Sequence, residues 1–291
     1  MKIEFTPVII IGAGRSGTNM LRDAICKAPG FETWDCDEIN PIWRHGNTQH
    51  ADDAFGVELA TPAVRSYLRS KFIAQWKRQG QPKYLVEKTC ANSLRVSFIA
   101  SIFPEAKFLY LVRNGNDVAA SASKRWRGEM EIPSLPYYIS KIRNTPISDL
   151  PHYGWRFLSS RADIYLGKKQ HMSFWGPQFP GLKDLPTDTP LMELCAQQWA
   201  SCVNTSDEAF AALEPSRWIK TRYEDFVANP HASIRAVFEF LEVDVSDSLI
   251  EKTTSDISPK SVGKAKKLGQ DFNETVRNIL APAMVKHNYT D

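Results

Sequence analysis

The most constraining feature of the sequence is an apolar run that ends in glycine and leads directly into a helical pattern. Residues 7–11 (PVIII) are apolar and stop at Gly12, which predicts a buried strand. The following segment TNMLRDAICKA has apolar residues at helical spacing, and Pro29 and Gly30 end it. A strand, a glycine-rich turn and a helix in this order predict the first unit of a parallel sheet.

The same alternation continues along most of the chain. Strands are predicted in FETWDC, KYLVEK, KFLYLVR and the start of RWIKTRYEDF, which we expect to end in a loop. Helices are predicted over residues 59–79 and in SLRVSFIASIF, NDVAASASKRW and HASIRAVFEFLEV. This pattern predicts a single α/β domain over residues 1–291, a parallel β-sheet flanked by helices on both faces. Ligands of such sheets bind at the carboxyl ends of the strands, and Arg15, Lys88 and Arg113 come at three of these ends.

Residues 127–195 interrupt the alternation. The segment is rich in proline and aromatic residues and has no clean period. Long irregular inserts in compact domains are usually lids or binding elements, so we predict an acceptor-binding or lid insert here. A structural cover for the sheet is the alternative.

Composition limits the class of protein. The chain has 291 residues, of which 43% are hydrophobic, enough for a sizeable core. A net charge of +3 is too small to predict a nucleic-acid partner. No apolar run is long enough for a membrane span, and the N-terminus does not resemble a secretory signal. The five cysteines are scattered without a C-x-x-C pair, which predicts reduced thiols in a cytoplasmic protein and no zinc site.

The turn after the first strand has two interpretations. Gly12, Gly14 and Gly17 form G-x-G-x-x-G, the dinucleotide fingerprint, in a position where backbone N–H groups and the helix dipole attract an anion. That interpretation needs an acidic residue near the end of the second strand. Three carboxylates lie there: Asp35, Asp37 and Glu38.

The side chains of the turn favour a different anion. Arg15 offers a planar fork for oxyanions, and Ser16 and Thr18 add hydroxyl donors. Such a loop suits an exposed phosphate or sulfate group better than a buried pyrophosphate. The Walker A spacing and its Lys-Ser/Thr pair are missing, which argues against a magnesium-dependent nucleoside-phosphate kinase.

A second anion site is predicted after the strongest strand. In FLYLVRNGNDVAASASKRW, Arg113 leaves the strand, Asp117 is a plausible N-cap of the next helix, and Ser121 lies one turn further on. Arg113 and Ser121 are therefore expected to converge on one anion.

At these two motifs the sequence resembles the sulfotransferases that use 3′-phosphoadenosine 5′-phosphosulfate (PAPS). GAGRSGTN resembles the family's loop for the 5′-phosphosulfate, and RNGNDVAAS resembles its 3′-phosphate motif. FPEAKFLYLVR and TRYEDFVANPHASIRAVFEFL match the usual flanks, and SPKSVGKAKKL resembles the C-terminal loop that closes over the nucleotide. The resemblance covers most of the chain and fails in the insert.

The sequence departs from the family pattern at three positions. Arg15 stands where cytosolic members often have Lys. An Arg at this position is the pattern of branches that act on protein tyrosines and on carbohydrates. Asn19 replaces a common threonine, and Ala265 stands where an aromatic residue is frequent.

The resemblance implies a P-loop-like sulfotransferase fold and in-line, metal-independent transfer from PAPS, with 3′-phosphoadenosine 5′-phosphate (PAP) as product. Arg15 and Lys88 would stabilise the developing charge, and Glu38 would be the base. Asp35, Asp37, His45 and His50 are rival bases. The nucleotide-binding residues implied are Gly14, Arg15, Ser16, Gly17, Thr18, Asn19, Arg113, Ser121, Tyr223, Ser261, Gly263 and Lys264.

Several alternatives stay open. The partner is expected to be a hydroxyl-bearing acceptor: a carbohydrate, a phenol or tyrosine, or a lipid. An NAD(P)-dependent Rossmann oxidoreductase is the main competing function, and a silent nucleotide-binding protein is another. Tyr223 is equally well interpreted as a core residue, Lys88 as the partner of Glu87, and Glu38 as the partner of Arg44. Nothing in the sequence predicts an oligomeric state.

Overall fold

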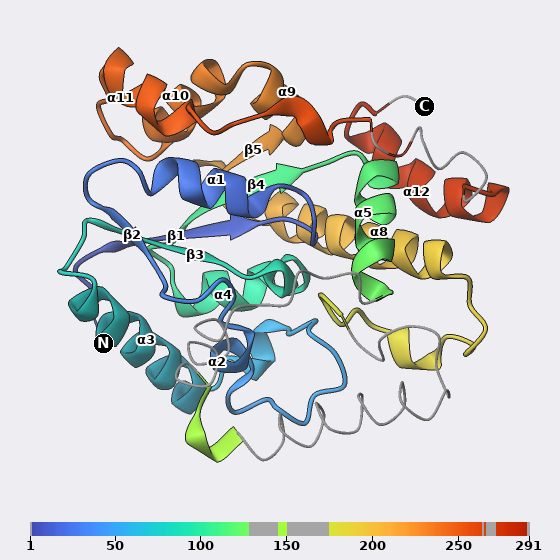
Figure 1. Cartoon of the computed structure of the whole chain (residues 1–291). Coiled ribbons are helices and arrows are strands. Elements are labelled where there is room, and N and C mark those ends of the chain that lie inside the picture. The colour runs from blue at the N-terminus through green and yellow to red at the C-terminus, as the bar shows by residue number, and fades with distance from the viewer. Residues whose placement is uncertain (1, 128–144, 150–174, 264, 266–271, 290–291) are drawn as a thin grey trace.

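The fold is built on a parallel sheet with the strand order β2-β3-β1-β4-β5. The computed structural model describes residues 2–127, 145–149, 175–263, 265 and 272–289 (Figure 1). The strands are β1 (Thr6–Ile11), β2 (Phe31–Thr33), β3 (Tyr84–Lys88), β4 (Lys107–Val112) and β5 (Trp218–Arg222). All four strand pairings are parallel, as the alternation of strands and helices predicts.

β1 lies at the centre of the sheet because it is apolar on both faces. Its residues Val8 to Ile11 are fully buried, and it pairs with β3 on one side and β4 on the other. A strand covered on both faces has a continuous apolar run rather than an alternating one, which is the pattern of PVIII. The chain reverses its direction across the sheet at β1, the position at which open α/β sheets bind ligands.

Helices cover both faces of the sheet, as expected from the sequence (Figure 1). One face packs against α1 (Thr18–Ile25), α9 (Tyr223–Ala228), α10 (Pro230–Phe240) and α11 (Asp247–Thr254). The other face packs against α2 (Asn40–Arg44), α3 (Pro62–Arg78), α4 (Val96–Ile102), α5 (Gly115–Trp126), α8 (Leu191–Ala211) and α12 (Glu274–Lys286). Short 3₁₀ turns connect these elements: η1 (Val57–Leu59), η2 (Cys90–Leu94), η3 (Ile147–Asp149), η4 (Leu182–Asp184), η5 (Pro215–Arg217) and η6 (Pro259–Ser261).

Three predicted boundaries are wrong. RYEDF does not end in a loop: α9 begins at Tyr223, with Glu224 and Asp225 in its first turn where the helix dipole favours acidic residues. The second strand stops at Thr33 instead of continuing through WDC. The irregular segment does not reach residue 195, because α8 begins at Leu191. Most of the predicted insert, residues 128–144 and 150–174, lies outside the described residues.

None of the helices in the described ranges is long and apolar enough to cross a membrane.

Candidate active site

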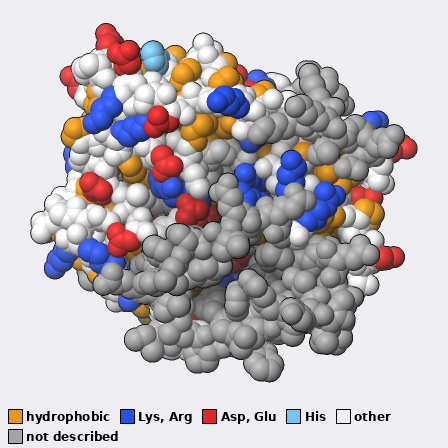
Figure 2. All heavy atoms as spheres, viewed as in Figure 1, with side chains coloured by type: hydrophobic (Ala, Val, Ile, Leu, Met, Phe, Trp, Pro, Cys, Tyr) orange, Lys and Arg blue, Asp and Glu red, His pale blue; other side chains and the backbone are white. Residues whose placement is uncertain are grey.

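The strand order brings three cationic side chains to one edge of the sheet. Lys88 is the last residue of β3, Arg15 lies in the turn after β1, and Arg113 directly follows β4. Because β3, β1 and β4 are parallel neighbours, their carboxyl ends lie side by side. Blue and red side chains lie next to one another near the middle of the face shown in Figure 2. The sequence prediction of a shared edge is therefore confirmed for these three residues.

The β1–α1 turn is shaped to present donors to an anion. Arg15 and Gly17 have left-handed backbones, with φ of 72° and 91°. Ser16 is only 1% exposed, and its hydroxyl has no hydrogen-bond partner among the described residues. A buried hydroxyl without a partner is unfavourable unless a ligand supplies one. Thr18, also buried, begins α1, so the amides of the turn lie at a helix N-terminus.

Arg15 joins the two predicted anion sites. Its guanidinium Nε donates to Ser121 Oγ on α5 at 2.9 Å, and its backbone carbonyl accepts from Arg113 at 3.0 Å. Burial and the nearby charges of Arg125 and Arg113 lower the pKa of Arg15, so two further cations lie close to it. The sequence predicted that Arg113 would converge directly with Ser121, whereas in the structure Arg15 lies between them.

Arg113 is held in place by its surroundings. Its guanidinium carbon lies 4.3 Å from the centre of the Tyr223 ring, and it donates to the backbone carbonyl of Ser261. Tyr223 also packs on the β1–α1 turn, since a Cβ on Gly17 would lie 2.5 Å from two of its ring atoms. Arg113 Nε is buried and has no hydrogen-bond partner in the described part of the chain. Tyr223 is therefore both a core residue and a support for two elements of the site.

Asp117 is not the N-cap that the sequence predicts. Asn114 takes that place: its side chain accepts from the amides of Asn116 and Asp117, at 2.9 and 3.4 Å. The Asp117 carboxylate instead accepts from the amides of Gly263 and Ala265, at 2.7 and 2.8 Å. Asp117 also lies 3.5 Å from the Arg113 guanidinium, so it holds the predicted C-terminal loop beside Arg113. Lys264 lies outside the described residues.

Lys88 and Glu38 form the second half of the site. The Lys88 side chain is 2% exposed, and its ammonium lies 3.0 Å from the carboxylate of Glu38, which also accepts from the Cys90 amide at 3.3 Å. Burial opposes ionisation of Glu38, but Lys88 and the amide outweigh it and lower the pKa of Glu38. Burial likewise opposes the charge on Lys88, yet Glu38 and Asp37 raise its pKa. Glu38 is therefore an anion at neutral pH, with 30% of its side chain exposed.

The rival bases are engaged elsewhere. Asp37 lies 3.5 Å from Lys88, but it also accepts from Arg22 at 2.6 Å and from Asn19 at 3.3 Å. Burial is again outweighed by Lys88 and Arg22, so the pKa of Asp37 is lowered. Asn19, which the resemblance implies for nucleotide binding, is the donor of the 3.3 Å contact with Asp37.

The remaining candidates also have partners. Asp35 contacts Arg78 and Gln79 at the end of α3. The two histidines contact aspartates at 2.8 and 3.4 Å: His45 with Asp149 and His50 with Asp52.

Two residues near the turn were not singled out from the sequence. Arg125 lies one turn beyond Ser121 on α5 and adds its charge to the field at Arg15. Its i+4 spacing from Ser121 is the signal that could have identified it. Trp175 packs on the turn, 3.4 Å from where a Cβ on Gly14 would lie. No sequence signal sets it apart from the other aromatics of the predicted insert. In the described ranges, no group of three or more His, Cys, Asp or Glu side chains is arranged to hold a metal ion.

Comparisons with known proteins identify the family. The chain matches the sulfotransferase family over residues 7–143 and 168–247. No curated protein sequence matches it significantly.

Solved structures share the fold at low identity. The sulfotransferase domain from the curacin biosynthetic pathway is 14% identical, with a TM-score of 0.53 over 100% of this chain and 99% of that one. Mouse sulfotransferase SULT7A1, solved with PAP, is 16% identical, with a TM-score of 0.51 over 99% and 90%. Sulfotransferase STF9 from Mycobacterium avium is 11% identical, with a TM-score of 0.51 over 99% and 78%. The chain belongs to the sulfotransferase family and is a sulfotransferase enzyme.

Proposed function

We propose that this enzyme transfers the sulfuryl group of PAPS to a hydroxyl of a carbohydrate, a phenol or tyrosine, or a lipid, and releases PAP. The observation that carries the proposal is the contact between Lys88 and the ionised Glu38 at the edge of the sheet that also holds Arg15. This edge has what the reaction needs: cations for the leaving phosphate and a base for the acceptor. Family membership removes the support for an NAD(P)-dependent oxidoreductase.

The PAPS nucleotide would supply acceptors for hydrogen-bond donors of the site that lack a partner among the described residues. The buried Ser16 hydroxyl and the turn amides would bind the 5′-phosphosulfate, with Gly14, Gly17 and Thr18 shaping the turn. Arg113, through its unpartnered Nε, and Ser121 would bind the 3′-phosphate. The backbone near Ser261 and Gly263 would border that site. The mouse enzyme of similar fold, solved with PAP, supports this choice of nucleotide.

The proposal gives each of these side chains a part in the transfer. Glu38 removes the proton of the acceptor hydroxyl while the hydroxyl oxygen forms a bond to the sulfur of PAPS. The bond between that sulfur and the 5′-phosphate oxygen breaks on the opposite side, and the electron pair stays with the phosphate. Arg15 and Lys88 stabilise the charge that develops on this leaving oxygen, as cationic groups do in phosphoryl transfer. Lys88 also keeps Glu38 ionised before the reaction begins.

Calorimetric titration with PAP tests the nucleotide site. The wild type is expected to bind PAP saturably, and Arg113→Ala to weaken binding by at least tenfold. The matched control is Lys83→Ala, because Lys83 is exposed and precedes β3, at the opposite end of the strand that Lys88 ends. Binding of NADH without binding of PAP would contradict the proposal.

Transfer of labelled sulfate from PAPS tests the chemistry. The acceptors are p-nitrophenol, a tyrosine peptide, a hexose and a sterol. Glu38→Gln is expected to lower the rate with the best acceptor by at least a hundredfold while PAP binding stays within threefold. An unchanged rate would assign the base to another residue, with Asp37 as the nearest candidate.

We also propose a cytoplasmic setting. All five cysteines are free, in keeping with a compartment that keeps thiols reduced.

A further inference from the structure

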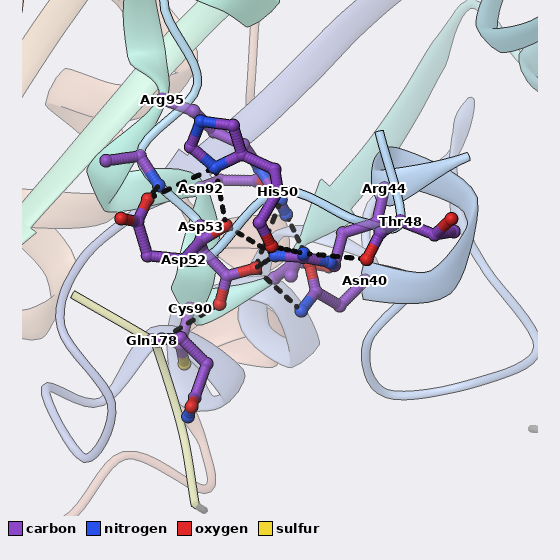
Figure 3. Close-up of polar contacts among 12 residues, drawn as sticks. Asn40, Arg44, Thr48, His50, Asp52, Asp53, Cys90, Asn92, Arg95 and Gln178 are labelled. Atoms are coloured by element: carbon purple, nitrogen blue, oxygen red, sulfur yellow. Dashed lines mark hydrogen bonds and ion pairs between the residues drawn. The ribbon is translucent and has the colours of Figure 1, made fainter. Parts of the chain in front are cut away.

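A buried polar cluster beneath the site has no direct role in the chemical steps proposed above. It connects the segment after β2 with the segment after β3, and Figure 3 shows part of it around Asp53. Its members Glu87, Thr89, Asn92 and Arg95 are at most 1% exposed. Buried polar groups are costly unless they are hydrogen-bonded, so a cluster of this size calls for an explanation.

The Thr89 hydroxyl joins the two segments. The backbone amide of Ile39 donates to Thr89 Oγ1 at 3.0 Å, and Thr89 Oγ1 donates to Glu87 at 2.5 Å. The directions are fixed, because the amide can only donate and its hydrogen occupies one lone pair of the hydroxyl. The hydroxyl hydrogen is then free to point at the Glu87 carboxyl. Residue 39 is thereby attached to the end of β3.

A second path returns to the same segment. The other oxygen of Glu87 accepts from Asn92 at 2.7 Å, and Asn92 accepts from Arg95 at 2.9 Å. Arg95 in turn donates to the side chain of Asn40 at 2.6 Å, so the hydrogen bonds leave the segment at residue 39 and re-enter it at residue 40. Asn40 also contacts Asp53, 3.3 Å away, as Figure 3 shows.

The cluster lies directly against the two charged residues of the site. Glu38 precedes Ile39, and Lys88 stands between Glu87 and Thr89. Successive side chains of a strand point to opposite faces, so Glu87 and Thr89 anchor the backbone from the side opposite to Lys88. The 3.0 Å contact between Lys88 and Glu38 is therefore fixed through the backbone of both residues.

We infer that Thr89 is a positioning residue of the transfer reaction: its hydroxyl, oriented by Glu87, holds the Glu38 carboxylate against Lys88 and toward the acceptor. The inference rests on the proposed function, with Glu38 as the base. Small displacements of a base reduce rate far more than they reduce ligand affinity. A role in positioning thus predicts a loss in kcat with little change in nucleotide binding.

The test compares two substitutions at one position. Thr89→Val keeps the shape and removes the hydroxyl, whereas Thr89→Ser keeps the hydroxyl. With labelled PAPS and the best acceptor of the panel, Thr89→Val is expected to lower kcat at least tenfold. The KM for PAPS and the Kd for PAP should stay within twofold, and Thr89→Ser should keep kcat within threefold of the wild type. The control is Thr253→Val, which removes an equally buried hydroxyl on α11 and should leave kcat unchanged.

A pH profile separates positioning from a merely structural role. Loosening the contact with Lys88 raises the pKa of Glu38, so the acid limb of kcat should move to higher pH in Thr89→Val. Glu87→Gln provides a second variant should Thr89→Val not fold. It replaces one of the two accepting oxygens of Glu87 with an NH₂ group, which cannot accept the hydrogen bond from Asn92 or Thr89. The expected loss in kcat is at least threefold.

Two outcomes would overturn the inference: kcat of the folded variants within twofold of the wild type, or Thr89→Ser as impaired as Thr89→Val. Failure of the proposed function looks different. In that case the wild type transfers no sulfate from PAPS, or Glu38→Gln is fully active.

Discussion

Lys88 determines the electrostatics at the edge of the sheet. It is almost fully buried, yet its charge is retained because two carboxylates lie within 3.5 Å. The same charge keeps Glu38 ionised against the effect of burial. One ammonium group therefore keeps Glu38, the proposed base, ionised and would also be available to the leaving group.

Replacing this ammonium should change the pH dependence of the reaction. In Lys88→Met, burial of Glu38 is no longer offset, so the pKa of Glu38 rises and the acid limb of the rate profile moves to higher pH. The rate at its maximum should also fall, by about a hundredfold, because a charge at the leaving oxygen is lost. Transfer rates between pH 4 and pH 9 measure both effects. Lys83→Met should leave the profile unchanged, and an unshifted acid limb in Lys88→Met would contradict this account.

Glu87 should make stability depend on pH in the opposite sense to most carboxylates. Burial raises its pKa to about 7, despite the hydrogen bond from Thr89 and the charge of Arg95. The folded state thus holds this proton more tightly than the unfolded state does. The resulting stability is fully present below pH 4.5 and is lost as the pH rises through 7, by roughly 3 kcal/mol at most.

Urea unfolding at pH 5 and pH 8 checks this. Glu87→Gln should lose less stability than the wild type between the two pH values. Glu208→Gln, at an exposed position on α8, should behave as the wild type. Equal slopes in the wild type and Glu87→Gln would show that Glu87 is ionised throughout.

At the scale of elements, the β1–α1 turn is tightly constrained by its backbone and its neighbours. Arg15 and Gly17 both have left-handed backbones, and the ring of Tyr223 fills the space where a side chain on Gly17 would stand. The turn, α5 and the start of α9 therefore fit together as one unit. A change in the turn should affect nucleotide binding even where the rest of the fold survives.

Gly17→Ala tests this fit. The added methyl lies 2.5 Å from Tyr223 and the left-handed backbone is unfavourable for alanine, so the free energy of unfolding should fall by about 2–4 kcal/mol and PAP binding should be lost. Gly80→Ala is the matched control: its φ is 77° but no atom lies within 4 Å, so only about 1–2 kcal/mol is expected. Equal losses in the two variants would show that Tyr223 can move aside.

The sequence predicts the elements whose burial pattern is simple. β1 and β4 are uninterrupted apolar runs, and the cations that follow them lie together because parallel strands end at one edge. α8 is harder to recognise because its buried residues cover most of the circumference and include the polar side chains of Gln198, Ser206 and Asp207, so only a narrow polar stripe is left at helical spacing. The role of Asp117 depends on amides 146 and 148 residues away, and no local pattern reports such a contact.

At the scale of the whole molecule, a buried carboxylate links the C-terminal helix to the sheet, in addition to the hydrogen bond from Tyr289 to the Val112 carbonyl of β4. Asp207 on α8 accepts from Tyr110 of β4 at 2.9 Å. It also contacts His287 and Lys286 at the end of α12, at 3.0 and 2.8 Å. Three elements distant in sequence thus meet at one acceptor.

Asp207 should stabilise the molecule in a defined pH range. Burial opposes its ionisation, but His287 and Lys286 lower its pKa to about 2. A depressed pKa gives stability that is present above about pH 4 and is lost as the pH falls toward 2. Asp207→Asn should lower the free energy of unfolding at pH 7 by about 3 kcal/mol and flatten the acid dependence. Melting temperatures from pH 2 to pH 7 test this, with the exposed Asp244→Asn expected to match the wild type.

The position of Arg15 has a consequence for selectivity between ligands. Arg15 belongs to the turn proposed for the 5′-phosphosulfate, and its carbonyl and guanidinium also contact Arg113 and Ser121, the residues proposed for the 3′-phosphate. A nucleotide fragment that carries a single phosphate would bind at only one of these two proposed sites and leave the other unoccupied. The binding free energies of two such fragments should therefore add up to less than that of PAP. Selectivity would then depend on the distance between the two anionic groups and not only on their number.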